Sequence, residues 1–520
     1  MTSRKPRRRS PHWRTRMPAE DSLAKRLYDG AGLSPGAAAL IGEDESVSYT
    51  ALVQRVERYA LALQHLLPER GSRVALCAAN HIEHLLCYIA ILVAGYVWVP
   101  MNPKNGRALN SVILKKAAPD LLLTDMGSRA NAPESGNQLL LGNAAEGIHS
   151  IAEISSRLPY RNFTPHIALP DDIAAIKFTG GTTGEPKGVM QTHANMLAVM
   201  DSMQSFYRFS ARDCNLAVAP LTHGSSHYVF PVLAMGGRHR FVDELSADRI
   251  LAALRSGTTV TFMPPTLIYK LMDSASAAPA DFLALRHLTY SAAPMPVERI
   301  RQAQAIFGPC ISTVYGQTEA PLMISALSPA EMLLPEKQST VGRAGCGCEI
   351  RIVDDEGRNQ PAGSVGNISV KGPIVMPGYL DDPGQTARVL RDGWLITGDL
   401  GHLDDDGYLS LVGRASELII TGGFNVFPAE VENAVVGMPG IRECCVFGVA
   451  DDHWGERIEA AVTVADDFRG TQSDILDWVR IHIGPIRTPK AVHIVTMIPR
   501  NAVGKIVRRD MPKYLRLEPQ

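Results

Sequence analysis

A glycine- and threonine-rich stretch has the residue types that suit a phosphate group. It reads TGGTTGEPKG at residues 179–188 and directly follows the apolar segment 173–178. Glycines permit positive φ angles, so backbone N–H groups can converge on an anion, while threonine hydroxyls add donors and Lys187 adds a positive charge. A Walker A motif would have Gly-Lys followed by Ser or Thr, whereas here Pro186 precedes the lysine and Gly188 follows it. The stretch therefore predicts a phosphate-binding loop of another kind.

A second stretch, YGQTEA at residues 315–320, places an aromatic ring and a carboxylate at the end of an apolar segment. Strand ends in α/β sheets are where ligands bind. Tyr315 can stack on a nucleotide base, and Glu319 is a hard oxygen ligand suited to a Mg²⁺ ion that bridges phosphates. Taken alone, the stretch would more often be a capped strand end.

Two further stretches carry residues that could contact a nucleotide. Asp399 lies in a Gly-Asp turn, where its carboxylate could accept two hydrogen bonds from a vicinal diol such as ribose, and Arg414 could assist. Lys505 follows a loop containing Pro and Gly, in PRNAVGKIVRR at residues 499–509. An isolated Asp of this kind is usually plain turn chemistry, and a lone lysine in a tail is usually a solvated charge.

Alternating strands and helices must position these residues. Apolar residues spaced by three and four predict a helix over 50–66, and a second helix is expected over 81–94. Between and after them, short apolar runs predict strands at 73–78, 96–100, 119–125, 173–178, 257–263, 287–291 and 311–315. This alternation favours parallel sheets covered by helices, and segment 126–150 is expected to be a surface loop.

The pattern changes after about residue 340. Short segments rich in β-branched residues, at 349–354, 366–371 and 407–412, indicate a small antiparallel unit. After Arg414 come predicted helices over 428–437 and 473–483, with predicted strands over 443–449 and 459–464. We therefore predict an α/β protein with three parts: a disordered basic tail at 1–20, a large N-terminal domain of helix-covered sheets with a small β subdomain at 21–413, and a small mobile α+β C-terminal lid domain at 414–520.

Composition excludes several classes of protein. The 520 residues are 45% apolar and 20% charged, which is a globular profile and not that of a disordered chain or a disulfide scaffold. A net charge of −1 gives no overall reason to expect nucleic-acid binding. The longest uncharged apolar run, 85–101, is shorter than a membrane span and is interrupted by Gly95 and Pro100, so no stable membrane insertion is expected. The eight cysteines form no Cys-x-x-Cys motif, which favours reduced thiols in the cytoplasm. The oligomeric state is left open, a homodimer being one option.

The four stretches, in this order and spacing, resemble the adenylate-forming (AMP-binding) superfamily, in its acyl/aryl-CoA synthetase branch. The resemblance covers about residues 22–512. It implies that ATP activates a small-molecule carboxylic acid to an acyl-adenylate with release of pyrophosphate, and that coenzyme A then displaces AMP to form a thioester. ATP, Mg²⁺ and coenzyme A are the implied co-substrates and cofactor. Transfer of the acyl group to a carrier-protein pantetheine is the main alternative, ahead of an oxygen-dependent adenylate oxidase and a nucleotide-binding regulator without turnover.

The resemblance also implies a role for each matching residue in the first half-reaction. Thr318 and Glu319 match phosphate and magnesium residues, Asp399 and Arg414 match a ribose-binding pair, and Lys505 matches a lysine that bridges the substrate carboxylate and phosphate. The remaining ATP-binding positions implied are Thr179, Gly180, Gly181, Thr182, Thr183, Gly184 and Lys187 for the phosphates, and Ser291, Ala292, Ala293, Tyr315, Gly316 and Gln317 around the base and its strand.

For the acid and the thiol, the resemblance implies a further set of residues. His223 in PLTHGSSHY lies near the carboxylate and the pocket entrance, while Gly422 and Gly423 line the coenzyme A tunnel. Ser416 matches the hinge, where the family usually has Asp or Lys, and Gly180 stands where the loop usually has Ser. No Asp occurs between residues 219 and 240 to pair with a substrate amine, so a simple carboxylic acid is favoured. The identity of the acid is left open.

Overall fold

The structure is a computed structural model that describes residues 21–145, 147–160, 163, 165–166, 168–180, 185–274, 278–501 and 505–517. The predicted tail at 1–20 and the loop residues Gly181, Thr182, Thr183 and Gly184 lie outside this set. Among the described residues, no helix combines the length and the apolar character that crossing a bilayer requires.

A six-stranded sheet begins the N-terminal part, in the order β6-β5-β3-β4-β7-β8. Its strands are β3 (Arg73–Cys77), β4 (Val97–Met101), β5 (Leu121–Thr124), β6 (Gln138–Leu140), β7 (Ile173–Gly180) and β8 (Pro186–Thr192). All neighbours are parallel except the β7–β8 hairpin. Strand β6 falls inside segment 126–150, so the prediction of a simple surface loop there was wrong. Its three residues pair with β5 as a sheet edge, a contact too short to leave a sequence pattern.

A nine-stranded sheet packs beside it, in the order β15-β14-β13-β12-β11-β9-β10-β1-β2. Its strands are β1 (Ala38–Ile41), β2 (Ser46–Ser48), β9 (Cys214–Leu216), β10 (Arg238–Arg240), β11 (Val260–Met263), β12 (His287–Tyr290), β13 (Ile311–Gln317), β14 (Ala320–Leu327) and β15 (Arg343–Ala344). The run from β1 through β10, β9, β11 and β12 to β13 is parallel, as the alternating pattern predicted.

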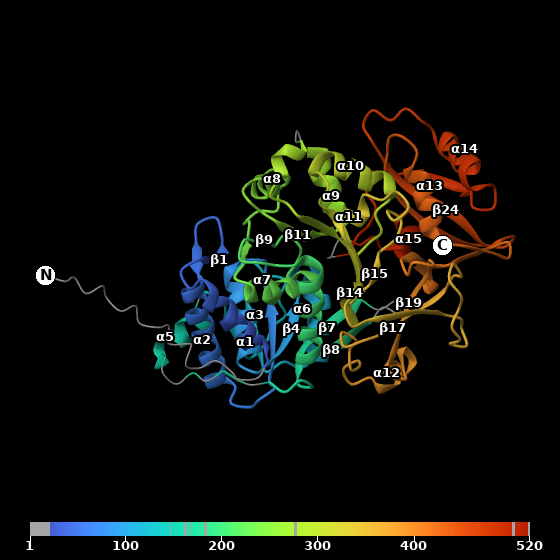
Figure 1. Ribbon diagram of the computed structural model, residues 1–520. Helices are drawn as coiled ribbons and strands as arrows, with labels where there is room; N and C mark the ends of the chain where they lie inside the picture. Colours follow the sequence, from blue (N-terminus) through green and yellow to red (C-terminus); the bar gives the residue numbers. More distant parts are fainter. Residues whose placement is uncertain are drawn as a thin grey trace.

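Helices cover these sheets and bury apolar residues, as α3 and α6 do. Figure 1 shows these two helices beside β4 and β7. The predicted helix 50–66 is α2 (Tyr49–Leu66), which begins where the Ser48 side chain accepts a hydrogen bond from Ala51 N. The other α-helices of this part are α1 (Leu23–Leu33), α3 (Ile82–Val93), α4 (Gly106–Ala117), α5 (Ile151–Arg157), α6 (His193–Tyr207), α7 (Val229–Ala234), α8 (Ala247–Arg255), α9 (Pro265–Ser274), α10 (Val297–Phe307), α11 (Pro329–Met332) and α12 (Pro383–Val389), with 3₁₀ turns η2 (Pro103–Asn105), η4 (Gly224–Tyr228) and η5 (Pro279–Phe282).

A third, five-stranded sheet is antiparallel and confirms the small β subdomain. Its strands are β16 (Glu349–Val353), β17 (Gly366–Lys371), β18 (Leu390–Arg391), β19 (Trp394–Leu403) and β20 (Leu409–Arg414). Asp399 lies inside β19, so its prediction as a turn residue was wrong. Gly398, with φ of +74°, produces a local irregularity instead of a chain reversal, and β19 continues past it to pair with β20.

The C-terminal part is an α+β unit, drawn in orange to red beside β15 and α11 in Figure 1. Its sheet has the order β22-β21-β24-β23, with β25 added beside β24. The elements are η6 (Ala415–Glu417), β21 (Ile419–Thr421), β22 (Phe424–Val426), α13 (Pro428–Val436), β23 (Ile441–Asp451), β24 (Gly455–Val464), α14 (Gln472–Ile483), β25 (Ala491–Ile494), η7 (Arg508–Asp510) and α15 (Met511–Tyr514). The structure thus confirms the predicted α/β fold with a large N-terminal and a smaller C-terminal domain.

Arg508 ties the last segment of the chain to this C-terminal sheet. Its guanidinium donates to the carboxylate of Glu432 on α13 and to the Val446 carbonyl on β23, and it pairs with Glu417 at 3.2 Å. A buried guanidinium stays favourable only when its donors are satisfied in this way. The segment that carries Lys505 is therefore anchored three residues beyond that lysine.

Buried histidines give the N-terminal part a predictable response to acid. Burial lowers the pKa to about 4 at five of them and well below the ordinary value at a sixth; they are His84, His193, His223, His239, His287 and His227. In the unfolded chain a histidine titrates near 6.5. The unfolded state therefore binds more protons as pH falls from about 6.5 towards 4, so stability is lost across that window.

We predict that unfolding at pH 5.5 is accompanied by the uptake of roughly five or six protons, nearly one for each of these histidines. Potentiometric titration of the native protein and of the protein in a denaturing concentration of urea gives this number as the difference in bound protons. The same experiment at pH 8 is the control, because free histidine is already neutral there. An uptake of fewer than about two protons at pH 5.5 would contradict the buried, neutral state of these side chains.

Candidate active site

Asp399 is the point at which side chains from two sheets meet. On β19 it lies directly opposite Arg414 of β20, and Arg414 Nε is 3.0 Å from its Oδ1. From the nine-stranded sheet, the Tyr315 hydroxyl donates to Asp399 Oδ2 at 2.7 Å and Gln317 Nε2 lies 3.4 Å from the same oxygen. Burial and the neighbouring Asp399 raise the pKa of Tyr315 well above its usual range, so the phenol stays protonated as a donor.

An irregular turn in β13 lets these side chains reach Asp399. The pairing of β13 with β14 shifts register between Tyr315 and Gln317, as in a β-bulge. Gly316 at this point allows no side chain, because an added Cβ would lie 2.3 Å from Leu322 N. Leu322 itself has a φ of +54°, which is uncommon for a branched residue. The strand therefore turns sharply where its predicted nucleotide-contacting residues begin.

Glu319 and Lys187 both lie beside one tyrosine, Tyr379. The Tyr379 hydroxyl donates to Glu319 Oε1 at 2.8 Å, and Lys187 Nζ is 5.6 Å from the centre of its ring. The backbone is also fixed, because Met376 N donates to the Glu319 carbonyl and Gln191 Nε2 donates to the Thr318 carbonyl. Sequence reasoning missed Tyr379, which lies 60 residues from Glu319 in the chain and in no motif.

The glycine-rich stretch begins in β7 and ends in β8, which pair as an antiparallel hairpin. Thr179 pairs with Lys187, and Gly180 pairs with Pro186, so strand pairing extends to both ends of the stretch. The predicted phosphate contacts of Gly181, Thr182, Thr183 and Gly184 fall outside the described residues. The hairpin places Lys187 beside Tyr379, the residue whose hydroxyl donates to Glu319.

The predicted adenine-lining residues follow β12. Ser291 is buried, whereas Ala292 and Ala293 are exposed. Ala292 has a φ of +73°, a left-handed conformation that costs a residue with a Cβ about 1–2 kcal/mol. Strain of this kind persists where the surrounding structure imposes it, and it occurs often at functional sites.

His223 begins the turn η4 and is held by a neighbour. Its Nδ1 lies 2.9 Å from the Thr222 hydroxyl, and its carbonyl accepts a hydrogen bond from Ser226 Oγ at 2.8 Å. Burial, together with the charges of Lys177 and Lys505, lowers the pKa of His223 to about 4. Its imidazole is therefore neutral near pH 7.

Lys505 comes from the C-terminal part but belongs to the same group of charges. Its backbone is held by a turn in which Lys505 N donates to Asn501 Oδ1 at 2.9 Å. Desolvation and the charge of Arg414 lower the pKa of Lys505, while Asp399 and Glu319 act in the opposite direction. The side chain remains accessible to solvent at the junction of the two parts. Charge interactions thus link Lys505 with His223, Glu319, Asp399 and Arg414.

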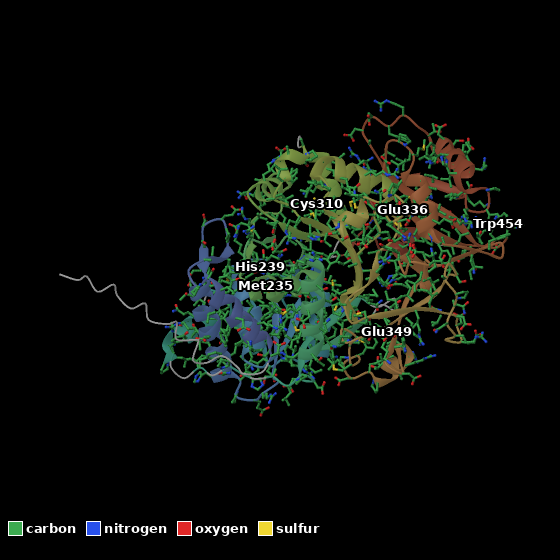
Figure 2. The ribbon with its side chains drawn as sticks, in the orientation of Figure 1. Met235, His239, Cys310, Glu336, Glu349 and Trp454 are labelled. Carbon is green, nitrogen blue, oxygen red and sulfur yellow. The ribbon has the colours of Figure 1, made fainter. Side chains whose placement is uncertain are left out.

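The predicted thiol-tunnel residues lie elsewhere in this arrangement. Gly422 and Gly423 form the turn between β21 and β22, with φ of +55° and +81°. An added Cβ on Gly422 would meet the ring of Trp454, but on Gly423 it would meet nothing within 4 Å. Figure 2 shows Trp454 at the outer edge of the C-terminal part. Ser416, the predicted hinge, is exposed in η6 directly after β20.

Comparisons with known proteins identify the family of the chain. The chain matches the AMP-binding enzyme family over residues 28–380 and the AMP-binding enzyme C-terminal domain over residues 430–505. It is 32% identical over 485 residues to a feruloyl-CoA synthase of Amycolatopsis sp, covering 92% of this chain and 96% of that protein. It is 31% identical over 477 residues to a medium/long-chain-fatty-acid–CoA ligase of Mycobacterium tuberculosis, covering 87% of this chain and 83% of that protein. The crystal structure of ATP-bound MatB from Rhodopseudomonas palustris superposes with a TM-score of 0.85 at 28% identity, covering 94% of this chain and 98% of that one.

The chain therefore belongs to the AMP-binding enzyme family, in its acyl- and aryl-CoA ligase branch. It is an acid–thiol ligase: it activates a carboxylic acid with ATP and transfers the acyl group from the adenylate to coenzyme A. The resemblance drawn from the four sequence stretches is confirmed at this level.

Proposed function

We propose that the two half-reactions share the site around Asp399, with residue roles as the family resemblance implies. Asp399 and Arg414 bind the ribose, Tyr315 and the segment Ser291–Ala293 flank the adenine, and Gly316 and Gln317 shape the strand between them. The β7–β8 turn, with Thr179, Gly180 and Lys187, holds the phosphates, and Thr318 lies beside them. The observation that carries this proposal is the contact of Tyr315 and Arg414 with Asp399, a carboxylate whose charge also acts on Lys505 of the C-terminal part.

Glu319 is the proposed ligand of a Mg²⁺ ion, and its environment fits that role. Its Oε1 is oriented by Tyr379, and the carboxylate as a whole is an oxygen donor of the kind that Mg²⁺ prefers. No cluster of three or more His, Cys, Asp or Glu side chains gathers in the part of the chain that the structure describes. A Mg²⁺ ion here would be held by one carboxylate together with phosphate oxygens and water, and would neutralise phosphate charge.

Positive charge supplied by the chain would drive adenylation. The attack of a carboxylate on the α-phosphate gathers negative charge on both groups, so catalysis is mostly positioning and charge neutralisation. Lys505 would contact the carboxylate and phosphate oxygens, and Lys187 the departing pyrophosphate. A neutral His223 beside them can donate or accept a hydrogen bond without repelling Lys505. Residence in the cytoplasm belongs to the same proposal, in line with eight cysteines that form no disulfide.

Formation of the thioester would need a second arrangement of the C-terminal part. With Lys505 at the site, the turn at Gly422 and Gly423 lies away from it, and the neighbouring Ile420 and Phe424 are 53% exposed. A rotation at Ser416 would exchange the lysine for this turn, and the exposed apolar residues would then be buried. Ser416 carries no charge, so no ion pair at the hinge itself favours either arrangement.

The proposed function is tested by measuring AMP release from ATP with a panel of carboxylic acids, with and without free coenzyme A. Aliphatic, alicyclic and aromatic acids should be included because the sequence does not choose among them. Release of AMP that depends on both an acid and coenzyme A supports the proposal. Acid-dependent ATP–pyrophosphate exchange without any response to coenzyme A would favour a carrier-protein acceptor instead.

Replacing Lys505 should separate the two half-reactions. We expect Lys505→Ala to slow ATP–pyrophosphate exchange about a hundredfold or more, because one charge contact made in the transition state is lost. Conversion of pre-formed acyl-adenylate to thioester should change less than about threefold. Lys513→Ala, an exposed lysine in the same terminal segment, is the matched control. Equal loss of both half-reactions would contradict the assigned role.

Replacing Gly423 should have the opposite effect. We expect Gly423→Leu to leave ATP–pyrophosphate exchange within about threefold, because an added side chain meets open space in the present arrangement, and to cut thioester formation at least about fiftyfold. Gly407→Leu is a close control, since Gly407 also has a φ of +81° and open space around it but lies in the turn before β20. A matching loss in both variants would show that backbone strain, and not obstruction of the thiol, is responsible.

The Tyr315 hydroxyl should contribute about as much to the free energy of ATP binding as one hydrogen bond. Tyr315→Phe leaves Asp399 paired with Arg414 but removes a donor that orients the carboxylate. We expect the Kd for ATP, measured by calorimetry, to rise about tenfold, which corresponds to about 1.4 kcal/mol. Tyr514→Phe at the exposed end of the chain is the control. An unchanged Kd would mean that Asp399 does not contact the nucleotide in the oriented form assumed here.

A further inference from the structure

Lys177 is a buried lysine that no sequence motif assigns to the site. It lies on β7, three residues before Gly180, and is only 5% exposed. Its Nζ donates to Ser226 Oγ at 3.1 Å and to His227 Nε2 at 2.9 Å, and lies 5.2 Å from the centre of the Trp98 ring. An ammonium group has three donors, so these two contacts leave one N–H.

No carboxylate compensates the charge of Lys177 among the residues that the structure describes. Its two hydrogen-bond partners are both uncharged, since burial and Lys177 itself hold the pKa of His227 well below the usual range. Burial alone lowers the pKa of Lys177 to about 7. A buried cation with neutral partners is unfavourable unless a counter-ion joins it. An apolar side chain would fill the same space without this cost, so the lysine is not explained by packing alone.

Lys177 is also close to the acyl end of the site. Ser226, which accepts from Lys177, donates to the carbonyl of His223, and the charges of both Lys177 and Lys505 reach the His223 ring. The two lysines therefore lie near the same histidine, one from each part of the chain.

The strand face that bears Lys177 is turned to the same region. Lys177 lies opposite Val189 on β8, and Gln191 is two residues further along that face. Gln191 donates to the Thr318 carbonyl, while its own Oε1 has no partner within the described residues. Val189 packs in the cluster that contains Phe262 and Leu322, the two side chains against Gly224 of η4.

Two buried donors without partners lie on the side of Lys177 that faces Trp98 or next to that ring. The indole nitrogen of Trp98 is fully buried and lacks a hydrogen-bond partner in the described part of the chain. The hydroxyl of Tyr88, whose ring lies 4.4 Å from that of Trp98, is in the same situation. Buried polar groups normally find partners, so donors left over around an unpaired ammonium indicate a place for an acceptor that is supplied by a ligand.

We propose that Lys177, Ser226 and His227 form a subsite for a second carboxylate, and that the enzyme activates a dicarboxylic acid. One carboxylate of the acid would face Lys505 and react with ATP, and the other would pair with Lys177. This inference rests on the proposed function, because it names the substrate class of the same site. The second carboxylate supplies the missing counter-ion, and acids that lack it leave the ammonium unpaired.

The test compares three matched series of acids in coenzyme A-dependent AMP release: straight-chain dicarboxylic acids, their monomethyl esters, and monocarboxylic acids of equal length. For the unmodified enzyme, we expect kcat/KM for the best diacid to exceed that of its half-ester and of the matched monoacid at least tenfold. The half-ester keeps a carbonyl acceptor without the charge, so it distinguishes pairing with the ammonium from simple hydrogen bonding. Equal use of all three series would overturn the proposal without any variant.

Variants then assign the preference to the lysine. Lys177→Met, close in length but uncharged, should lower kcat/KM for the diacid at least a hundredfold and change that for the monoacid less than about threefold. Lys104→Met, at an exposed lysine, should change neither. Activity with the monoacid also reports that the variant is folded. An unchanged ratio of diacid to monoacid in Lys177→Met would overturn the proposal, whereas no AMP release with any acid in the unmodified enzyme would overturn the proposed function itself.

Discussion

The site depends on the contacts made by the carboxylate of Asp399. It accepts a hydrogen bond from the Tyr315 hydroxyl of the nine-stranded sheet and forms an ion pair with Arg414 on the neighbouring strand of the antiparallel sheet. It also interacts electrostatically with Lys505 of the C-terminal part. The two sheets also share a buried apolar cluster, whereas the C-terminal part folds around a core of its own. A change in the register of β19 by one residue would turn this carboxylate to the opposite face and separate it from all three residues.

Charges at the junction are compatible with the rotation of the C-terminal part that we propose. Arg414 repels the charge of Lys505, while Asp399 and Glu319 attract it. Electrostatic repulsion and attraction therefore oppose each other at this lysine. A side chain also crosses between the parts: Arg299 donates to the Arg442 carbonyl at 2.9 Å and to the neighbouring Ile441 carbonyl at 3.2 Å. Bound anionic substrates would attract Lys505 only as long as their negative charge remains in the site. Consumption of the carboxylate and release of pyrophosphate would therefore weaken the arrangement that made the adenylate.

Local sequence patterns predicted the elements well because period and composition follow burial. The helix at 50–66 and the strand at 73–78 both occur within one residue of the expected bounds. The Gly-Asp pair predicts a turn at Asp399, but strand pairing with the neighbouring β20 overrides that local preference. Tyr379 and Lys177 could not be found in this way. The role of each depends on partners 60 and 50 residues away, and neither belongs to a short motif.

Two lysines of the site, Lys177 and Lys505, are both partly or fully desolvated without a dedicated carboxylate partner. An enzyme gains from such an arrangement when the substrate itself provides the negative charge, because the electrostatic field is then preorganised and needs no rearrangement during the reaction. Under the proposed rotation of the C-terminal part, Lys505 would return to solvent when the site is empty, and its charge would then cost little. Lys177 has no such escape, since it is fixed in a central strand beside Trp98. A cation that is buried permanently is expected to serve binding and specificity, and a cation that is mobile is expected to serve the chemical step.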